Sequence, residues 1–411
     1  MPEPVEIQDH SRTKMQELTL KPDAFAYRGK AVAAMPSGKR CFIRGGVPGD
    51  TLLCEITKEK KSYAEAEIRT VLHPSPDRIK PVCRYAGQCP GCSYSQVDYS
   101  TELAWKQRQF ERFLLHSNLA DPSAMRPPVP APQRAGWRNK IKLTVDKQGG
   151  EVRIGYLMED NRTVLDIREC LLARPEISRL MNTKLSDPAF RSNLPEGRSS
   201  LTFRFTPHDG ALLLEEEASR EFLTDTIRPY GEFAVPRNSF FQINTAMASR
   251  LAAEFIRIVE DLKPEVLIEL YCGCGVFSVL AAESGVGKVY GVEIDPDSVR
   301  AATRNLHEHG LPHCKFLAGD AVRMLGQLPL RTKQRPLLLV DPPRTGLERH
   351  VIDALTGSTI RDVIYISCGP DTLARDLALF REQGWRITQT GLFDLFPSTA
   401  HFESLTLLKR G

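Results

Sequence analysis

A cysteine and a glutamate near the C-terminal end of the sequence stand where apolar runs meet loops. Cys368 ends the apolar run of "YISCGP", with a Gly-Pro turn directly after it, and Glu403 begins the last apolar run after "FDLFPSTAHF". A cysteine in such a place can be a nucleophile, or it can be a small hydrophobe that completes a core. A nearby carboxylate can act as a general base. The neighbouring strand ends must decide between these interpretations.

A glycine turn between an apolar run and a predicted helix indicates a nucleotide site. In "VLIELYCGCGVFSVLAAES", Gly273 and Gly275 let the backbone approach a ligand at the helix N-terminus. The next run ends in Glu293, at a distance typical of an acid that binds ribose hydroxyls, and "FLAGD" places Asp320 where an adenine is expected. Ser278 replaces the third glycine of the dinucleotide fingerprint, which argues against NAD. The pattern E-x-x-C-G-x-G, then an acid, then Gly-Asp is similar to the S-adenosylmethionine site of class I methyltransferases.

The fourth strand end of this region reads "LLLVDPPRTGL". Amino-methyltransferases place an aromatic residue after Asp-Pro-Pro or Asn-Pro-Pro, where it stacks on the base that they methylate. Arg344 holds that position here, so no stacking ring is available. The motif also lacks the cysteine that RNA cytosine-5 methyltransferases usually place in it.

A cysteine and a carboxylate on the reactive edge suit methylation of carbon 5 of a pyrimidine. A thiolate from Cys368 that adds to carbon 6 makes carbon 5 nucleophilic toward a methyl sulfonium. Glu403 could then remove the proton from carbon 5, after the target base has left its stack. Two alternatives remain open: a methyltransferase that acts on an RNA amine or ribose hydroxyl, and a non-catalytic RNA-binding protein.

A separate cysteine cluster predicts a metal centre. "CRYAGQCPGC" contains Cys83, Cys89 and Cys92, and Cys170 in "DIREC" could be a fourth ligand. Four thiolates suit zinc or an iron–sulfur cluster, and three close cysteines with one remote one favour iron–sulfur. A radical enzyme would need a C-x3-C-x2-C run, which is not present. The remaining cysteines are expected to be packing residues: Cys41, Cys54, Cys272, Cys274 and Cys314.

The elements that must position these residues divide the chain into three predicted domains. From about residue 236 to 411, nearly continuous apolar runs alternate with helical patterns, which predicts an α/β, Rossmann-like doubly wound domain. Residues 11–72 alternate short apolar runs with Gly-rich turns and predict a small β-barrel. Residues 73–235 predict a mixed α+β region with the metal site. Its amphipathic helix near 98–117 is expected to pack on the catalytic domain.

Composition and charge restrict the class of protein. The hydrophobic fraction of 41% and charged fraction of 26% are those of a folded soluble protein, and no apolar run approaches a membrane span. The start, "MPEPVEIQDHSRTK", lacks the apolar core of a signal peptide, so a cytoplasmic protein with reduced cysteines and no membrane partner is expected. Residues 1–150 hold 24 Lys and Arg against 16 Asp and Glu, a net charge of +8. This excess suggests an anionic partner, although ordinary surface variation would explain it too.

The chain as a whole resembles the RNA uracil-5-methyltransferase family, which makes 5-methyluridine in tRNA or ribosomal RNA. The resemblance rests on the front barrel, the C-x5-C-x2-C…C set and the motifs "FFQIN", "ELYCGCG", "DPPRTG", "SCGPDTLARDL" and "PSTAHFE". It implies a TRAM-type barrel that binds RNA and a structural or RNA-positioning [4Fe–4S] cluster at the four cysteines named above. Large-subunit rRNA is the favoured substrate with tRNA second, and a monomer is expected.

The resemblance also implies roles for individual residues. Cys368 would be the nucleophile and Glu403 the base. The S-adenosylmethionine contacts would come from Gln242, Tyr271, Glu293, Asp320 and Asp341.

Three residues depart from the usual pattern of that family. Val276 and Gly369 stand where many members have Asn, and Ser398 stands where His is frequent. The first departure concerns cofactor affinity. The other two concern the pocket around the target base, and none removes a group that the mechanism requires.

Overall fold

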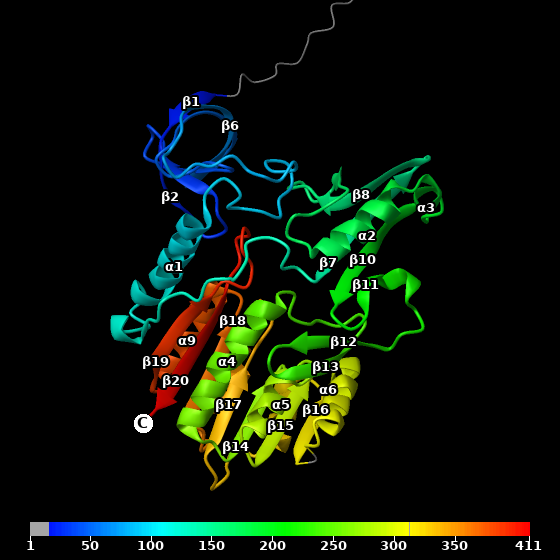
Figure 1. The fold of residues 1–411 in the computed structure, drawn as a ribbon. Helices are drawn as coiled ribbons and strands as arrows, with labels where there is room; N and C mark the ends of the chain where they lie inside the picture. The colour runs from blue at the N-terminus through cyan, green and yellow to red at the C-terminus, as the bar shows by residue number, and fades with distance from the viewer. Residues whose placement is uncertain (1–15, 312) are drawn as a thin grey trace, which may run out of the picture. The chain divides into compact units, whose positions relative to one another are not determined.

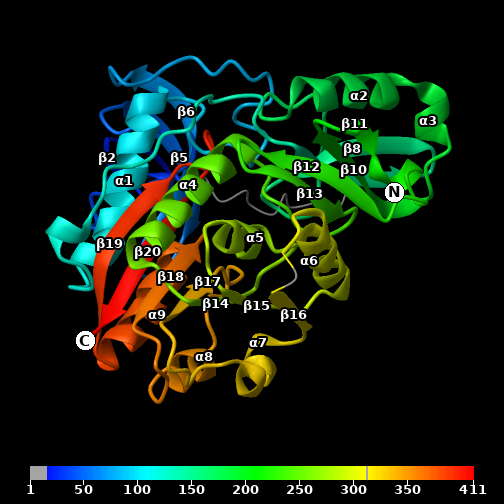
Figure 2. The ribbon, with the colours of Figure 1, turned by 60° about the horizontal axis from the view of Figure 1, so that its bottom comes forward.

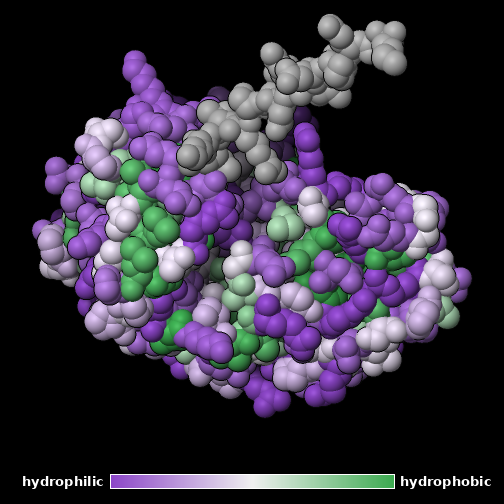
Figure 3. Space-filling model, turned by 90° about the horizontal axis from the view of Figure 1, so that it is seen from above, coloured by the Kyte–Doolittle hydropathy of each residue, from purple (hydrophilic) through white to green (hydrophobic). Residues whose placement is uncertain are grey.

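The structure, a computed structural model, describes residues 16–311 and 313–411. The chain divides into two compact units: unit 1 runs to Gly87 and includes Cys92–Glu102, and unit 2 comprises Gln88–Gly91 and Leu103–Gly411. The first residues of the predicted barrel domain, 11–15, and the start examined for a signal peptide lie outside the described residues. On the face shown in Figure 3, hydrophilic residues predominate and hydrophobic residues form smaller groups. None of the described helices is long and apolar enough to cross a bilayer.

Unit 1 contains a six-stranded sheet in the order β1-β5-β6-β4-β3-β2. The two edge strands, β1 and β2, are separated in the chain by Lys21 alone, so the edges come together and the sheet curls into a barrel (Figure 1). Alternate side chains of β5, among them Leu52 and Cys54, are buried inside it. The strands are β1 (Glu17–Leu20), β2 (Pro22–Phe25), β3 (Ala31–Ala34), β4 (Arg40–Ile43), β5 (Thr51–Glu59) and β6 (Tyr63–His73).

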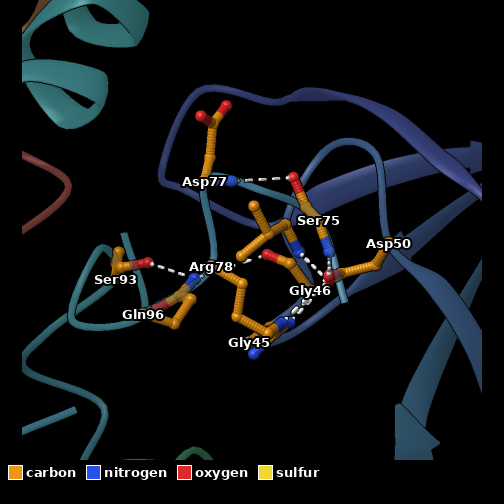
Figure 4. A network of polar contacts seen from close by, with 9 residues as sticks. Gly45, Gly46, Asp50, Ser75, Asp77, Arg78, Ser93 and Gln96 are labelled. Atoms are coloured by element: carbon orange, nitrogen blue, oxygen red, sulfur yellow. Dashed lines mark hydrogen bonds and ion pairs between the residues drawn. The ribbon is translucent and has the colours of Figure 1, made fainter. Parts of the chain in front are cut away.

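A buried ion pair joins this barrel to the segment that follows it. The Arg78 Nε atom donates to Asp50 Oδ1 at 3.0 Å, and the Asp50 side chain is fully buried (Figure 4). Asp50 also accepts the backbone N–H groups of Val47 and Ser75. Burial acts to raise the pKa of Asp50, but these hydrogen bonds, led by that from Arg78, hold it below its ordinary value. The ionised carboxylate therefore stabilises unit 1 at neutral pH, and this stabilisation is lost as the pH falls through the lowered pKa.

We expect Arg78→Gln to lower the free energy of unfolding of unit 1 by about 2–4 kcal/mol, because it leaves a buried carboxylate without its cation. Urea denaturation followed by circular dichroism would measure this loss. Arg40→Gln is the matched control, because the Arg40–Asp23 pair is more than half exposed and should contribute less than about 1 kcal/mol. Equal effects of the two substitutions would contradict the assignment.

The first part of unit 2 is an antiparallel sheet in the order β11-β10-β7-β8-β9. The apolar face of α2, with Ile177, Met181 and Leu185, is buried. A two-stranded hairpin, β12 with β13, follows the sheet. The elements are α1 (Tyr99–Leu115, of which 103–115 belong to unit 2), η1 (Pro122–Ala124), β7 (Lys140–Gln148), β8 (Glu151–Leu157), β9 (Val164–Asp166), α2 (Pro175–Ser186), α3 (Pro188–Ser192), β10 (Gly197–Thr206), β11 (Gly210–Leu213), η2 (Leu214–Glu216), β12 (Phe222–Ile227) and β13 (Gly231–Pro236).

The rest of unit 2 is a seven-stranded sheet in the order β16-β15-β14-β17-β18-β20-β19, parallel except for β20. Its helices lie on both faces (Figures 1 and 2). This arrangement is expected because the crossovers are right-handed and the strand order runs outward in two directions from β14 and β17. The elements are α4 (Thr245–Leu262), β14 (Val266–Leu270), α5 (Val276–Glu283), β15 (Lys288–Glu293), α6 (Pro296–Glu308), β16 (Cys314–Ala318), α7 (Ala321–Met324), η3 (Leu325–Gln327), β17 (Pro336–Val340), α8 (Arg349–Ala354), β18 (Asp362–Ser367), α9 (Pro370–Glu382), β19 (Trp385–Phe393) and β20 (Glu403–Arg410).

This sheet agrees with the predicted α/β doubly wound fold. The strand order reverses between β14 and β17, and ligands of such sheets bind outside the carboxyl ends of the strands at that point. All residues of β14 and β17 are buried, as the continuous apolar runs indicated.

Candidate active site

Three candidate residues meet at the carboxyl edge of the sheet. Asp341 directly follows β17 and Cys368 directly follows the neighbouring parallel strand β18. Glu403 begins the antiparallel strand β20, whose Ser404 is the register partner of Ser367. The fold therefore brings Cys368 and Glu403 together although 34 residues separate them in the chain.

The electrostatics of these groups confirm that they are close neighbours. Burial, then the carboxyls of Glu403 and Asp341, raises the pKa of Cys368 to about 12, while Arg344 acts to lower it. Burial raises the pKa of Asp341 to about 7, and burial followed by Asp341 raises that of Glu403 well above its ordinary value. The Glu403 Oε2 atom is buried and has no hydrogen-bond partner among the described residues. A buried oxygen of this kind is compatible with a catalytic role.

Sequence reasoning did not include Arg344 and His401 in this group. It considered Arg344 only because this residue is not an aromatic ring, yet the Arg344 guanidinium acts electrostatically on both Cys368 and Glu403. Its Nη2 atom lies 3.4 Å from His401 Nε2. The available signal was the place of this arginine, four residues after the end of β17 at the reactive edge.

The loop before Glu403 is anchored from two elements. Lys106 of α1 donates to Asp394 Oδ1 at 2.8 Å and to the Phe396 carbonyl at 3.2 Å, and both charged side chains are completely buried. The Asn244 amide of "FFQIN" donates to the Leu395 carbonyl at 2.9 Å. These bonds hold the loop that leads into Glu403.

The candidate cofactor residues surround the neighbouring strand ends. Gln242, Tyr271 and Asp341 line one pocket together with Gly273 and other loop residues. The buried Asn305 amide donates to the carbonyls of both Ala234 and Cys274, which ties the β12–β13 hairpin to this glycine loop.

Glu293 and Asp320 stand at the next two strand ends and do not line that pocket. The Glu293 carboxylate accepts the backbone N–H of Gly273 at 3.0 Å, and Asp320 accepts the N–H of Arg323 at the start of α7. Burial, then Glu348 and Asp320, raises the pKa of Tyr271 to about 12, so Tyr271 and Asp320 are near each other. The structure thus brings all five predicted cofactor residues to one edge of the sheet.

Comparisons with known proteins agree with this geometry. The family model of tRNA (uracil-5-)-methyltransferases matches residues 212–411. The C-terminal part of the chain is therefore similar to the RNA uracil-5-methyltransferase family. This methyltransferase is 28% identical to an uncharacterised RNA methyltransferase of Thermosynechococcus vestitus, over 95% of this chain and 97% of that protein. It is 26% identical to the 23S rRNA (uracil(1939)-C(5))-methyltransferase RlmD of Marinomonas posidonica, over 94% of each chain.

The fold is shared with a solved structure. The methyltransferase resembles the Pyrococcus abyssi tRNA (uracil-54, C5)-methyltransferase, crystallised with S-adenosyl-L-homocysteine, with a TM-score of 0.73 and 22% identity. The match covers 95% of this chain and 99% of the other. The family and the curated relatives identify the protein as an RNA uracil-5-methyltransferase enzyme.

The glycine loop of this methyltransferase explains one departure of its sequence. The Ser278 hydroxyl, in place of the third glycine, donates to the Glu269 carboxyl, and both side chains are buried. Burial raises the pKa of Glu269 to about 8. Val276 lines the cofactor pocket with an apolar side chain, so it offers no polar contact there.

Gly369 and Ser398 fill their positions for different reasons. The φ angle of Gly369 is −133°, which any residue adopts, so the backbone does not require glycine at this position. A Cβ atom there would lie 2.8 Å from Thr372 Oγ1, so glycine instead leaves room for this hydroxyl. Ser398 has a φ of +67°, and its hydroxyl accepts a hydrogen bond from Arg134 Nε at 3.1 Å.

Two exposed apolar residues next to candidate contacts were also missed. Phe240, 70% exposed, precedes Gln242 by two positions and lines the cofactor pocket. Ile294, 67% exposed, directly follows Glu293.

The four predicted metal ligands fall in both units. Cys83 and Cys92 belong to unit 1, and Cys89 and Cys170 belong to unit 2. Within residues 16–311 and 313–411, no three His, Cys, Asp or Glu side chains form a group that could hold a metal ion. In unit 2, burial followed by the Cys170 thiol raises the pKa of Tyr156, and the Cys89 thiol contributes too.

Proposed function

We propose that this enzyme transfers a methyl group from S-adenosylmethionine to carbon 5 of one uridine in RNA, through a covalent bond between Cys368 and carbon 6. The observation that carries the proposal is the meeting of Cys368, Glu403 and the pocket of Gln242, Tyr271 and Asp341 at one sheet edge. Amine or ribose methylation would need no thiol there.

The steps assign a task to each side chain. Cys368 loses its proton to water and adds to carbon 6, and the electron pair of the 5,6 double bond moves onto the ring as an enolate. S-adenosylmethionine, when bound, supplies the methyl group that carbon 5 takes up. Glu403 in its ionised form removes the proton from carbon 5, the double bond re-forms and the thiolate leaves. A raised pKa makes Glu403 a stronger base once it is ionised.

The cofactor site fits S-adenosylmethionine. Tyr271 and Gln242 would contact the methionine part and Asp341 its reactive end, while Glu293 would accept hydrogen bonds from the ribose and Asp320 from the adenine. The exposed Ile294 beside Glu293 offers an apolar surface for the adenine ring. The structure of the Pyrococcus abyssi relative with S-adenosyl-L-homocysteine supports this choice of cofactor.

We also propose a [4Fe–4S] cluster at Cys83, Cys89, Cys92 and Cys170, with a structural or RNA-positioning task. The Tyr156 hydroxyl is buried near the thiols of Cys170 and Cys89. The sulfur atoms of an anionic cluster would accept a hydrogen bond from this hydroxyl, which supports the proposal for unit 2. The assignment of Cys83 and Cys92 rests on the sequence pattern.

The barrel of unit 1 would be a TRAM-type RNA-binding domain. Several of its cations are already paired: Lys30 and Lys58 with Glu65, and Lys39 with Glu59. Lys60 and Lys61, exposed in the turn between β5 and β6, make no ion pair within the described part of the chain, which leaves them for phosphates. The name of the Marinomonas relative favours large-subunit rRNA over tRNA. We expect a monomeric enzyme that acts on such RNA in the cytoplasm.

RNA that carries 5-fluorouridine tests the proposal, because fluorine cannot leave carbon 5 as a proton. With S-adenosylmethionine and a large-subunit rRNA or tRNA transcript, we expect an adduct that survives denaturing electrophoresis. Cys368→Ala should form none, while Cys314→Ala, the matched cysteine control, should form as much as wild type. No adduct with either RNA, or an undiminished adduct in Cys368→Ala, would refute the assigned chemistry.

A further inference from the structure

The segment 238–243, which carries the candidate cofactor residue Gln242, lies between β13 and α4. Asn139, the residue just before β7, holds the backbone of this segment at two successive carbonyls. The Asn139 N–H donates to the Ile243 carbonyl at 2.9 Å, and the side-chain Nδ2 atom donates to the Gln242 carbonyl at 3.1 Å. Asn139 is 5% exposed, and its own carbonyl accepts the N–H of Phe205 on β10 at 2.8 Å. The main chain of Gln242 is therefore anchored to the antiparallel sheet, next to the pocket that Gln242 lines.

A buried ion pair sets the direction of the Asn139 amide. The Asp225 Oδ2 atom accepts from Asn139 Nδ2 and from Arg204 Nη2, both at 3.3 Å, and the two charged side chains are each 1% exposed. Beside this guanidinium Asp225 is ionised at neutral pH, and a carboxylate only accepts hydrogen bonds. The NH2 group of the amide, rather than its oxygen, therefore faces Asp225, and its second hydrogen is available to the Gln242 carbonyl. Removal of the amide would take one donor from each of these two acceptors.

The same ion pair supports the residue before Gln242. The Arg204 guanidinium lies 5.8 Å from the ring centroid of Phe241, a distance typical of a cation–π contact. Phe241 is buried and lines the cofactor pocket together with Gln242. Lys140, the first residue of β7, donates to the Ser239 carbonyl at 3.1 Å. One side of the segment is thus held at its backbone and at an aromatic ring by neighbouring residues of the antiparallel sheet.

We propose that Asn139 is a positioning residue of this methyltransferase. Together with the pair of Arg204 and Asp225, it fixes Gln242 in the orientation that binds the methionine part of S-adenosylmethionine. The inference rests on the proposed function, because that function assigns Gln242 its contact. A segment outside regular secondary structure has many conformations, and their loss opposes cofactor binding unless the protein has already fixed one of them. Loss of the network should therefore weaken cofactor binding and leave the chemistry at Cys368 little changed.

Calorimetry with S-adenosyl-L-homocysteine, without RNA, measures the expected effect. Asn139→Ala should raise the Kd of this ligand roughly tenfold, because two acceptors lose a donor and the segment loses its fixed path. Asn139→Ser, whose hydroxyl donates one hydrogen bond instead of two, should raise the Kd roughly threefold and serves as the test if the alanine variant does not fold. Asn182→Ala, at an exposed asparagine of α2, is the matched control and should leave the Kd unchanged.

Two further measurements separate positioning from stability and from chemistry. Ile177→Val, a buried change in α2, should lower the free energy of unfolding and leave the Kd unchanged. At saturating S-adenosylmethionine, Asn139→Ala should form the 5-fluorouridine adduct within roughly threefold of the wild-type rate.

An unchanged Kd in Asn139→Ala and Asn139→Ser overturns the inference. An equal rise of the Kd in Ile177→Val, or an adduct rate at saturation that falls as much as the affinity, overturns it as well. Absence of S-adenosyl-L-homocysteine binding by wild type overturns the proposed cofactor instead, so the two failures are distinguishable.

Discussion

The Glu403→Gln variant is expected to hold its methylated RNA as a covalent complex, with release slowed by roughly a thousandfold or more. The amide cannot accept the proton of carbon 5, so the double bond cannot re-form and the Cys368 thiolate cannot leave. Methyl transfer comes before this step and needs no base, so it should still take place. Ordinary uridine RNA, without fluorine, should therefore give an adduct that carries one added methyl group, measured by denaturing electrophoresis and mass spectrometry.

Glu348→Gln provides a matched control. Glu348 is another carboxylate near the site, since it acts on Tyr271, but the proposed chemistry assigns it no proton. We expect this variant to release 5-methyluridine RNA without a persistent adduct. Multiple turnovers by Glu403→Gln at the wild-type rate would show that another group removes the proton.

The second large effect concerns the buried ion pair between α1 and the loop before Glu403. Lys106→Met should lower the free energy of unfolding of unit 2 by about 3–5 kcal/mol, because the completely buried Asp394 loses its cation. Urea denaturation monitored by tryptophan fluorescence measures this loss. Because Glu403 follows the same loop, adduct formation at low urea should fall as well.

The double variant Lys106→Met/Asp394→Leu separates charge from packing. Replacing both charges by apolar groups of similar size removes the buried carboxylate together with its cation, so we expect most of the lost stability to return. The exposed pair of Arg257 with Asp261 offers a comparison, since Arg257→Gln should cost less than about 1 kcal/mol. A Lys106→Met protein as stable as wild type would contradict the stabilising role of the buried pair.

Much of the catalytic sheet was predictable because parallel strands leave a strong pattern. Apolar runs that end in Glu293, Asp320, Asp341 and Cys368 became β15, β16, β17 and β18, and each residue stands at or just beyond its strand end. Strands buried on both faces have few alternatives to such runs. The antiparallel return of β20 then placed Glu403 beside Cys368.

Contacts between distant segments were not predictable. Lys106 belongs to a helix whose amphipathic pattern was recognised, but nothing in that pattern indicates a lysine with no exposure at all. The partnership of Arg78 with Asp50 and that of Ser278 with Glu269 likewise depend on tertiary neighbours.

The segment that carries Cys83 and Cys92 has its two ends joined without any cysteine. The N–H of Ile79 bonds to the Gln96 carbonyl at 2.8 Å, and Arg78 fastens the same place to the barrel. The ends of this segment therefore keep their places whether or not a metal is bound. If the proposed cluster forms, its loss would leave the two ends of this segment joined.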